Sequence, residues 1–152
     1  MKQKTILSFS SICFLLFCFS CTTIGKLKKL QTSYIPDAVS DVFIGMSMKA
    51  LKESRGMENL SASKKGDLTI LKEEYKKDSI TLIQYNFNKK KKLSMIIIEY
   101  SDEYEIYDVL KSKLGEPNSN KAWLITLNDK FKLLIWVQQH ILCIADNKQF
   151  KN

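Results

Sequence analysis

Hydrophobic and polar positions divide the chain into a short apolar leader and a longer part in which the two kinds of residue alternate. Residues 6–19 are apolar apart from three serines, they follow Lys2 and Lys4, and the next charge is Lys26. Beyond residue 40, apolar residues recur at two-residue spacing in several stretches and at three- and four-residue spacing in others. These spacings are typical of strands and helices, respectively. The pattern therefore predicts a small α+β domain behind an N-terminal segment of a different kind.

The alternating stretches predict about six strands in two groups of three. Short polar spacers separate the strands within each group, which suits hairpin loops and antiparallel pairing. The stretch 93–100 is apolar on both faces, so we expect it to lie in the middle of the sheet. The predicted strands span residues 68–75, 80–87, 93–100, 121–127, 131–138 and 141–146.

Two helices are predicted, one before each group of strands. Ser47 is a suitable N-cap for a helix over residues 48–55. Asp102 and Glu105 have the spacing of a capping box for a helix over residues 102–114. The order α-β-β-β-α-β-β-β looks like a degenerate duplication, and we expect one antiparallel sheet with both helices on one face.

The N-terminal segment has the features of a bacterial lipoprotein signal peptide. A basic start, an apolar run of about 14 residues and a small residue before a break are typical of an export signal. Cys21 follows Ser20 where the apolar run ends, so we predict cleavage before Cys21 and lipidation of its thiol. Cys18 and Phe19 depart from the usual lipobox. A transmembrane anchor is the alternative, but the run is shorter than the ~20 apolar residues that span a bilayer.

This interpretation divides the chain into a signal peptide (1–20), a lipidated tether (21–40) and a single α+β domain (41–152). Of the four cysteines, only Cys143 then remains as a free thiol, so no internal disulfide is expected in the domain. The apolar strand around Cys143 favours a small buried side chain over a nucleophile. We expect the protein in the cell envelope on its lipid anchor, preferably in the outer membrane, facing either the periplasm or the outside.

The net charge of +8 suggests contact with an acidic surface. Two lysine clusters are candidates for such a contact: Lys26, Lys28 and Lys29, and the run Lys89, Lys90, Lys91 and Lys92. The first cluster lies close to the proposed lipid, where it would attract anionic headgroups, although a plain hydrophilic spacer is an equally good interpretation. The second is preferably a solvated hairpin tip. The lysines are spread along the whole sequence, which favours a solvated surface, and export argues against nucleic acid as a partner.

The residues needed for common catalytic and metal sites are scarce. His140 is the only histidine and is expected in a tight turn, so a catalytic triad or a zinc site has too few members. Four carboxylates cluster near the start of the second predicted helix, where the helix dipole favours them: Asp102, Glu103, Glu105 and Asp108. A hydrolase built on this cluster is a remote alternative. We therefore predict a protein that is not an enzyme and that needs neither a metal nor a cofactor.

Two short motifs resemble those of the small lipoprotein subunit of the outer-membrane β-barrel assembly machine, a small α/β fold shared with the β-lactamase inhibitor proteins. Residues 44–48 (Ile-Gly-Met-Ser-Met) resemble the turn before that family's first helix. Residues 114–117 (Leu-Gly-Glu-Pro) resemble its helix-ending phrase, although here they end the second helix, and Trp123 follows on a strand. Six strands exceed the family's single unit. The resemblance covers about residues 41–146 and implies a domain that binds proteins.

These observations predict a non-enzymatic envelope lipoprotein whose domain binds a protein partner, as an assembly or scaffolding factor. If exposed, Leu134 and Trp136 are the first candidates for the partner-binding surface, because exposed apolar patches mark interaction sites. An inhibitor, or a lipoprotein that binds a small ligand, is the alternative.

Overall fold

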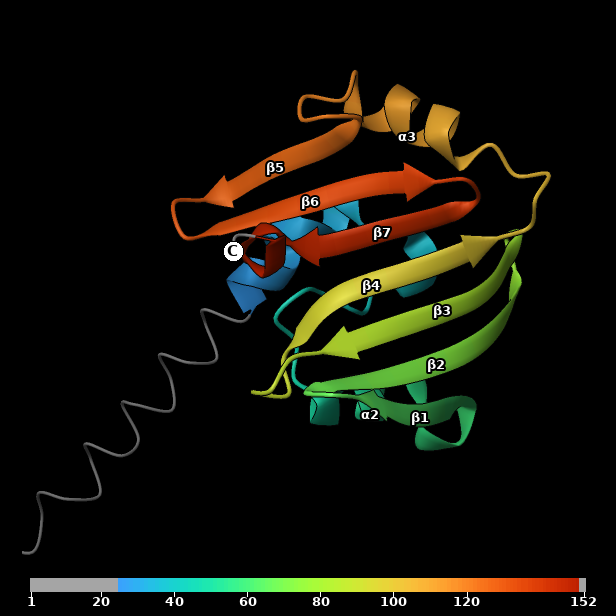
Figure 1. The fold of residues 1–152 in the computed structure, drawn as a ribbon, viewed down its shortest axis with the longest axis vertical. Coiled ribbons are helices and arrows are strands. Elements are labelled where there is room, and N and C mark those ends of the chain that lie inside the picture. Colours follow the sequence, from blue (N-terminus) through green and yellow to red (C-terminus); the bar gives the residue numbers. More distant parts are fainter. Residues whose placement is uncertain (1–24, 151–152) are drawn as a thin grey trace, which may run out of the picture.

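The structure is a computed structural model that describes residues 25–150, so the predicted cleavage site and Cys21 lie outside the described residues. Within residues 25–150, seven strands form one antiparallel sheet in the order β1-β2-β3-β4-β7-β6-β5 (Figure 1). The strands are β1 (Leu60–Lys65), β2 (Leu68–Lys77), β3 (Ile80–Phe87), β4 (Leu93–Tyr100), β5 (Ala122–Asn128), β6 (Phe131–Gln138) and β7 (Ile141–Asp146). The sheet and its helices place the fold in the predicted α+β class.

The expectation of about six strands was wrong because it missed β1. Only Leu60 of this strand is partly buried, and its other side chains are exposed. The strand therefore lacks apolar alternation and is held by backbone pairing with β2, from Leu60 opposite Glu73 to Lys65 opposite Leu68. Exposed lysines on an edge strand discourage pairing with another chain.

The order of the elements also differs from the predicted duplication. A helix over residues 25–31 precedes the expected repeat, and β1 adds a fourth strand to the first group. The second group joins the sheet through its last strand, with β7 antiparallel to β4. β4 thereby occupies the middle of the sheet, as its apolar character on both faces predicted.

Residues 25–40, expected to form most of a tether, are folded against the domain. Ile35 and Val39 are buried in the core. The segment consists of the helix 25–31 and two 3-10 turns, η1 (Thr32–Tyr34) and η2 (Asp37–Val39). The domain boundary predicted at residue 41 is therefore corrected to a position at or before residue 25.

Gln31 fixes the end of this first helix to the core. Its side chain is completely buried. The amide nitrogen donates to the carbonyl of Ile44 at 3.0 Å, and the amide oxygen accepts from the Ile44 N–H at 2.8 Å. Because both polar atoms of the side chain are paired, the buried amide does not carry an unsatisfied group.

Both helices bury side chains in the same core cluster, Leu51 from α2 (Met48–Arg55) and Ile106 and Leu110 from α3 (Ile106–Leu114), but they cover different parts of the sheet. α2 and the helical segments before it lie behind the sheet in Figure 1, whereas α3 lies along the edge formed by β5. α2 begins as predicted, because the Ser47 hydroxyl accepts from the Ala50 N–H at 3.2 Å. It buries Leu51 against the sheet.

α3 is held at the β5 edge by Trp123. The ring of Tyr107 on α3 lies 5.6 Å from the indole ring, centroid to centroid. The indole N–H donates to the carbonyl of Gly115, which follows α3, at 2.8 Å. The polar atom of a buried tryptophan thus has its partner, as a buried indole requires.

Antiparallel pairing sorts the connections between strands to two ends of the sheet. The turns after β1, β3 and β5 lie at the left-hand end in Figure 1, close to the helix 25–31. The turns after β2 and β6, and the connection from β4 to α3, lie at the right-hand end. We call these the N-terminal end and the distal end of the sheet.

Candidate functional site

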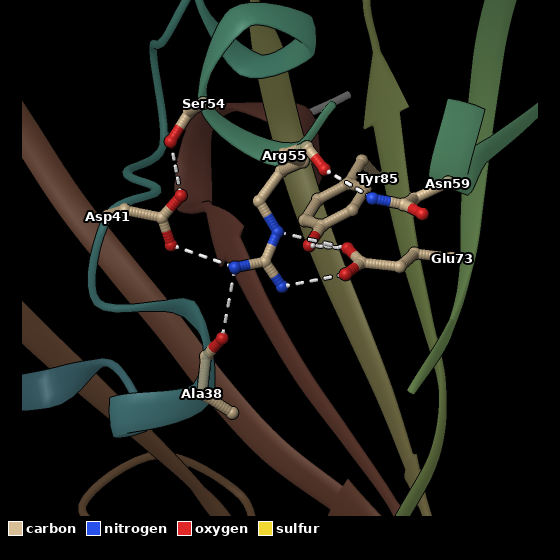
Figure 2. Close-up of polar contacts among 7 residues, drawn as sticks. All are labelled: Ala38, Asp41, Ser54, Arg55, Asn59, Glu73 and Tyr85. Atoms are coloured by element: carbon tan, nitrogen blue, oxygen red, sulfur yellow. Dashed lines mark hydrogen bonds and ion pairs between the residues drawn. The ribbon is translucent and has the colours of Figure 1, made fainter. Parts of the chain in front are cut away.

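A cluster of paired charges lies between α2 and the core face of the sheet (Figure 2). The Nε and Nη2 atoms of Arg55 donate to the two carboxylate oxygens of Glu73, at 3.0 and 3.1 Å. Nη1 donates to the carboxylate of Asp41 at 3.0 Å and to the carbonyl of Ala38 at 3.2 Å. The Tyr85 hydroxyl donates to Glu73 at 3.0 Å. One guanidinium therefore joins the N-terminal segment, α2 and the sheet, and we call this group the Arg55 cluster.

The Arg55 cluster is satisfied internally, which indicates a structural role. Burial works against the charged guanidinium, but the fields of Tyr85 and Glu73 outweigh it and raise the pKa of Arg55. Burial also raises the pKa of the Tyr85 hydroxyl far above its ordinary value. A charged arginine and a neutral tyrosine therefore hold the Glu73 carboxylate, and neither of them titrates near neutral pH.

The sequence interpretation missed this cluster and the burial of Glu73. Successive side chains of a strand point to opposite faces, so Glu74 is exposed while Glu73, 8% exposed, enters the core. One signal was available: Arg55 is the only arginine among 24 basic residues. A guanidinium pairs with a carboxylate through two parallel bonds that a lysine cannot form, so this sole arginine indicated a bidentate partner.

The opposite face of the sheet carries the predicted partner-binding residues. Leu134 and Trp136 both lie on it, and both are half-buried. Residues paired directly across neighbouring strands share a face, so the register extends this surface over β4, β5 and β7. We call it the open face, and its apolar members on these strands are Met95, Ile97, Ala122, Leu124, Leu134, Trp136, Ile141, Cys143 and Ala145. In Figure 1 it is turned toward the viewer, away from α2.

Cys143 belongs to the open face and pairs with Ile97 on one side and Trp136 on the other. Its side chain is buried, and this burial raises the pKa of the thiol to about 11. The thiol is therefore protonated at neutral pH, whereas the thiolate is the nucleophilic form. The prediction that Cys143 is a small buried side chain is confirmed.

His140 and part of the predicted acidic cluster meet at the distal end. Nδ1 of His140 lies 3.0 Å from the carboxylate of Asp102, and Nε2 lies 3.8 Å from that of Glu99. A cavity of about 510 Å³ lies between His140 and the start of α3, and Tyr104 and Glu105 help to line it. The side chain of Asp102 is 89% exposed, so water screens its attraction to the imidazole. Among residues 25–150, no three or more histidine, cysteine or carboxylate side chains are placed so that they could hold a metal ion.

The predicted capping box at Asp102 and Glu105 is wrong. α3 begins at Ile106, and Glu105 occupies the N-cap position without a side-chain hydrogen bond to the helix. The side chain of Asp102 instead contacts His140 on the neighbouring β6–β7 turn. Capping spacing alone did not distinguish a helix start from a loop that another part of the chain stabilises.

The lysines are dispersed in the sequence but gather in space at the N-terminal end. One predicted cluster lies on the helix 25–31 and the other in the turn between β3 and β4. The same end also holds Lys64, Lys65, Lys130, Lys132 and Lys148, and its carboxylates are Asp67, Asp129 and Asp146. Alternate turns of an antiparallel sheet meet at one end, so lysines that are far apart in the sequence lie together there.

Among residues 25–150, no helix has both the length and the apolar character needed to cross a membrane. No protein-family profile matches this chain, and no similar curated protein or solved structure was found. The resemblance of residues 41–146 to the assembly-machine lipoprotein stays a prediction.

Proposed function

We propose that this protein is a lipid-anchored, non-enzymatic module of the bacterial cell envelope that binds a protein partner on its open face. One observation carries the proposal: the open face is apolar across β4, β7, β6 and β5. A sheet covered by helices on one face only normally turns polar side chains to the other. Apolar side chains at these positions therefore suit a second protein surface.

Polar side chains of β3 lie beside this apolar part and give it a border on that side. Gln84 of β3 pairs with Ile97, and Asn86 pairs with Met95. An apolar centre with a polar rim is the usual anatomy of a protein interface. The border supports a surface that is bounded and specific.

A binding role also agrees with the state of the potentially reactive groups. The Arg55 cluster is occupied by its own members, and the Cys143 thiol is protonated. His140 contacts carboxylates that are open to water. These groups support a module that acts by contact, with the lipid on Cys21 holding it in the envelope, preferably at the outer membrane.

Site-specific crosslinking in intact cells tests the proposal. A photoreactive residue replaces Leu134 on the open face of the full-length protein, and a matched variant carries it at Val109 on α3, which is 47% exposed. We expect one discrete adduct from position 134 that Ile97→Lys abolishes, and no such adduct from position 109. The same diffuse products from both positions would contradict the proposal.

Binding of a small ligand, the second candidate, is favoured by the cavity beside His140. Its carboxylates and tyrosines suit a cationic ligand. A photoreactive residue at Gln139, which also lines this cavity, distinguishes the two candidates, because a ligand site would place the adduct there and leave position 134 unreactive. A hydrolase at the same place would additionally require a measured activity that Glu105→Gln removes.

A further inference from the structure

The two ends of the sheet carry opposite charge. The lysines of the N-terminal end are Lys26, Lys28, Lys29, Lys64, Lys65, Lys89, Lys90, Lys91, Lys92, Lys130, Lys132 and Lys148, against three carboxylates. The distal end carries Asp78, Glu99, Asp102, Glu103, Glu105 and Asp108, with Lys76, Lys77, Lys121 and His140 beside them. A charge separation of this size creates a field that orients the domain at a charged surface.

The lysines of the first helix are held in place. Gln31 is bonded to both backbone polar groups of Ile44, so the helix 25–31 moves with the core. Leu27 packs against the core on the same helix, while Lys26, Lys28 and Lys29 are exposed. Their direction relative to the sheet is therefore set by the fold, unlike that of charges on a flexible spacer.

Because residues 25–40 are folded, only a short connection separates this end from the proposed lipid on Cys21. The first described residue, Gly25, is four positions after Cys21. Four residues span at most about 14 Å even when fully extended. The connection is therefore short enough to let Lys26, Lys28 and Lys29 approach a headgroup surface that holds Cys21 to within the Debye length, which is ~10 Å at 0.1 M salt.

Apolar side chains lie among these lysines. A cavity of about 750 Å³ separates the helix 25–31 from the β5–β6 turn, and its walls include Leu27, Leu30, Leu127 and Phe131. Lys26 and Lys130 also line it, together with Asp129. Apolar groups beside lysines suit the boundary between acyl chains and headgroups, where both kinds of side chain find a partner.

We infer that the N-terminal end of the sheet is a docking surface for anionic lipid headgroups of the membrane that holds the N-terminal segment. Docking there points the strands away from the membrane and carries the distal end, with its carboxylates and His140, to the far side. The open face then stands upright, accessible to a partner from the side. This inference rests on the proposed anchoring, because the short connection to Cys21 selects a lipid surface over other anionic partners.

The test uses the full-length protein in vesicles of phosphatidylcholine with or without phosphatidylglycerol. A fluorophore is attached at Asp129→Cys in the β5–β6 turn or, as the matched site, at Glu103→Cys at the distal end. Nitroxides on the lipid headgroups quench a fluorophore that lies at the surface. We expect quenching at position 129 to be at least about threefold stronger than at position 103 on anionic vesicles, and high salt to reduce the difference.

Charge reversal supplies the second comparison. A triple variant should be quenched equally at positions 129 and 103; it carries Lys26→Glu, Lys28→Glu and Lys29→Glu. The matched control makes the same change in net charge elsewhere and should keep the stronger quenching at position 129; it carries Lys76→Glu, Lys77→Glu and Lys113→Glu. Equal quenching at both labels, or quenching that ignores phosphatidylglycerol, would overturn docking. Weaker binding of a duplex oligonucleotide by the first variant, with unchanged vesicle docking, would overturn it in favour of nucleic acid.

Intact mass spectrometry of the same sample separates this inference from the proposed function. Acyl mass on Cys21 together with equal quenching would refute docking and leave the anchoring supported. A chain without acyl mass would refute the anchoring. That chain would still support docking if it floats with anionic vesicles but not with zwitterionic vesicles, and it would refute docking if it floats with neither.

Discussion

The two faces of the sheet carry one tryptophan each, and the surroundings of the two rings differ. Trp123 is 1% exposed on the core face, with its indole N–H bonded to Gly115 and Tyr107 against its ring. Trp136 is half-buried on the open face, in a row with Ala122 and Cys143. The core face is sealed by the chain's own helices, whereas the open face presents apolar side chains beside a polar border. Stability is therefore expected to depend on one face and recognition on the other.

Truncation of the two tryptophans tests this division most strongly. Trp123→Ala should lower the free energy of unfolding by about 4 kcal/mol, because it leaves a large cavity in the core. Trp136→Ala should cost about 1.5 kcal/mol or less, since the ring is only half removed from water. Urea unfolding followed by circular dichroism measures both. Similar losses for the two variants would show that the open face is packed as firmly as the core.

The glutamates at positions 73 and 74 sharpen the comparison at single-residue resolution. Glu73→Ala leaves Arg55 in the core without its bidentate partner and should cost about 3 kcal/mol, since an uncompensated charge remains buried. Glu74→Ala, one position along β2 and 82% exposed, should change the stability by less than about 0.5 kcal/mol. The same unfolding experiment reports both values. An equally small loss of stability in Glu73→Ala and Glu74→Ala would mean that water reaches the Arg55 cluster.

Cys143 gives the open face a pH-dependent signature. Its pKa is raised by burial from 9.0 to about 11. The unfolded thiol ionises first, so its stabilising contribution is complete below about pH 9 and is lost as the pH rises toward 11. Relative to Cys143→Ala, the wild type should lose up to about 1.4 kcal/mol of stability per pH unit across this window. If the difference in unfolding free energy between the wild type and Cys143→Ala stays constant with pH, the thiol is open to water in the folded state.

The sequence predicted those parts of the fold in which local pattern and tertiary packing agree. β4 is apolar on both faces and lies in the middle of the sheet. Cys143 lies in an apolar strand and is buried. In these cases the buried side chains are themselves apolar, so the pattern of apolar residues along the strand predicts their burial.

The parts that the sequence did not predict depend on contacts between distant segments. β1 is held by backbone bonds to β2, which leave no trace in its exposed side chains. Gln31 is a polar residue whose burial depends on Ile44, 13 positions away. The charged N-terminal end arises from turns that only the sheet brings together. Local spacing carries no information about such pairings.

The two predicted helix caps provide the test with the smallest expected effect. Ser47 caps α2, which covers the core face, whereas Asp102 does not cap α3. Ser47→Ala removes the acceptor of the Ala50 N–H and should cost about 1 kcal/mol. Asp102→Ala should change the stability by less than about 0.5 kcal/mol, since its exposed carboxylate only contacts His140. A cost for Asp102→Ala that matches the cost for Ser47→Ala would show that the distal loop is anchored as firmly as α2.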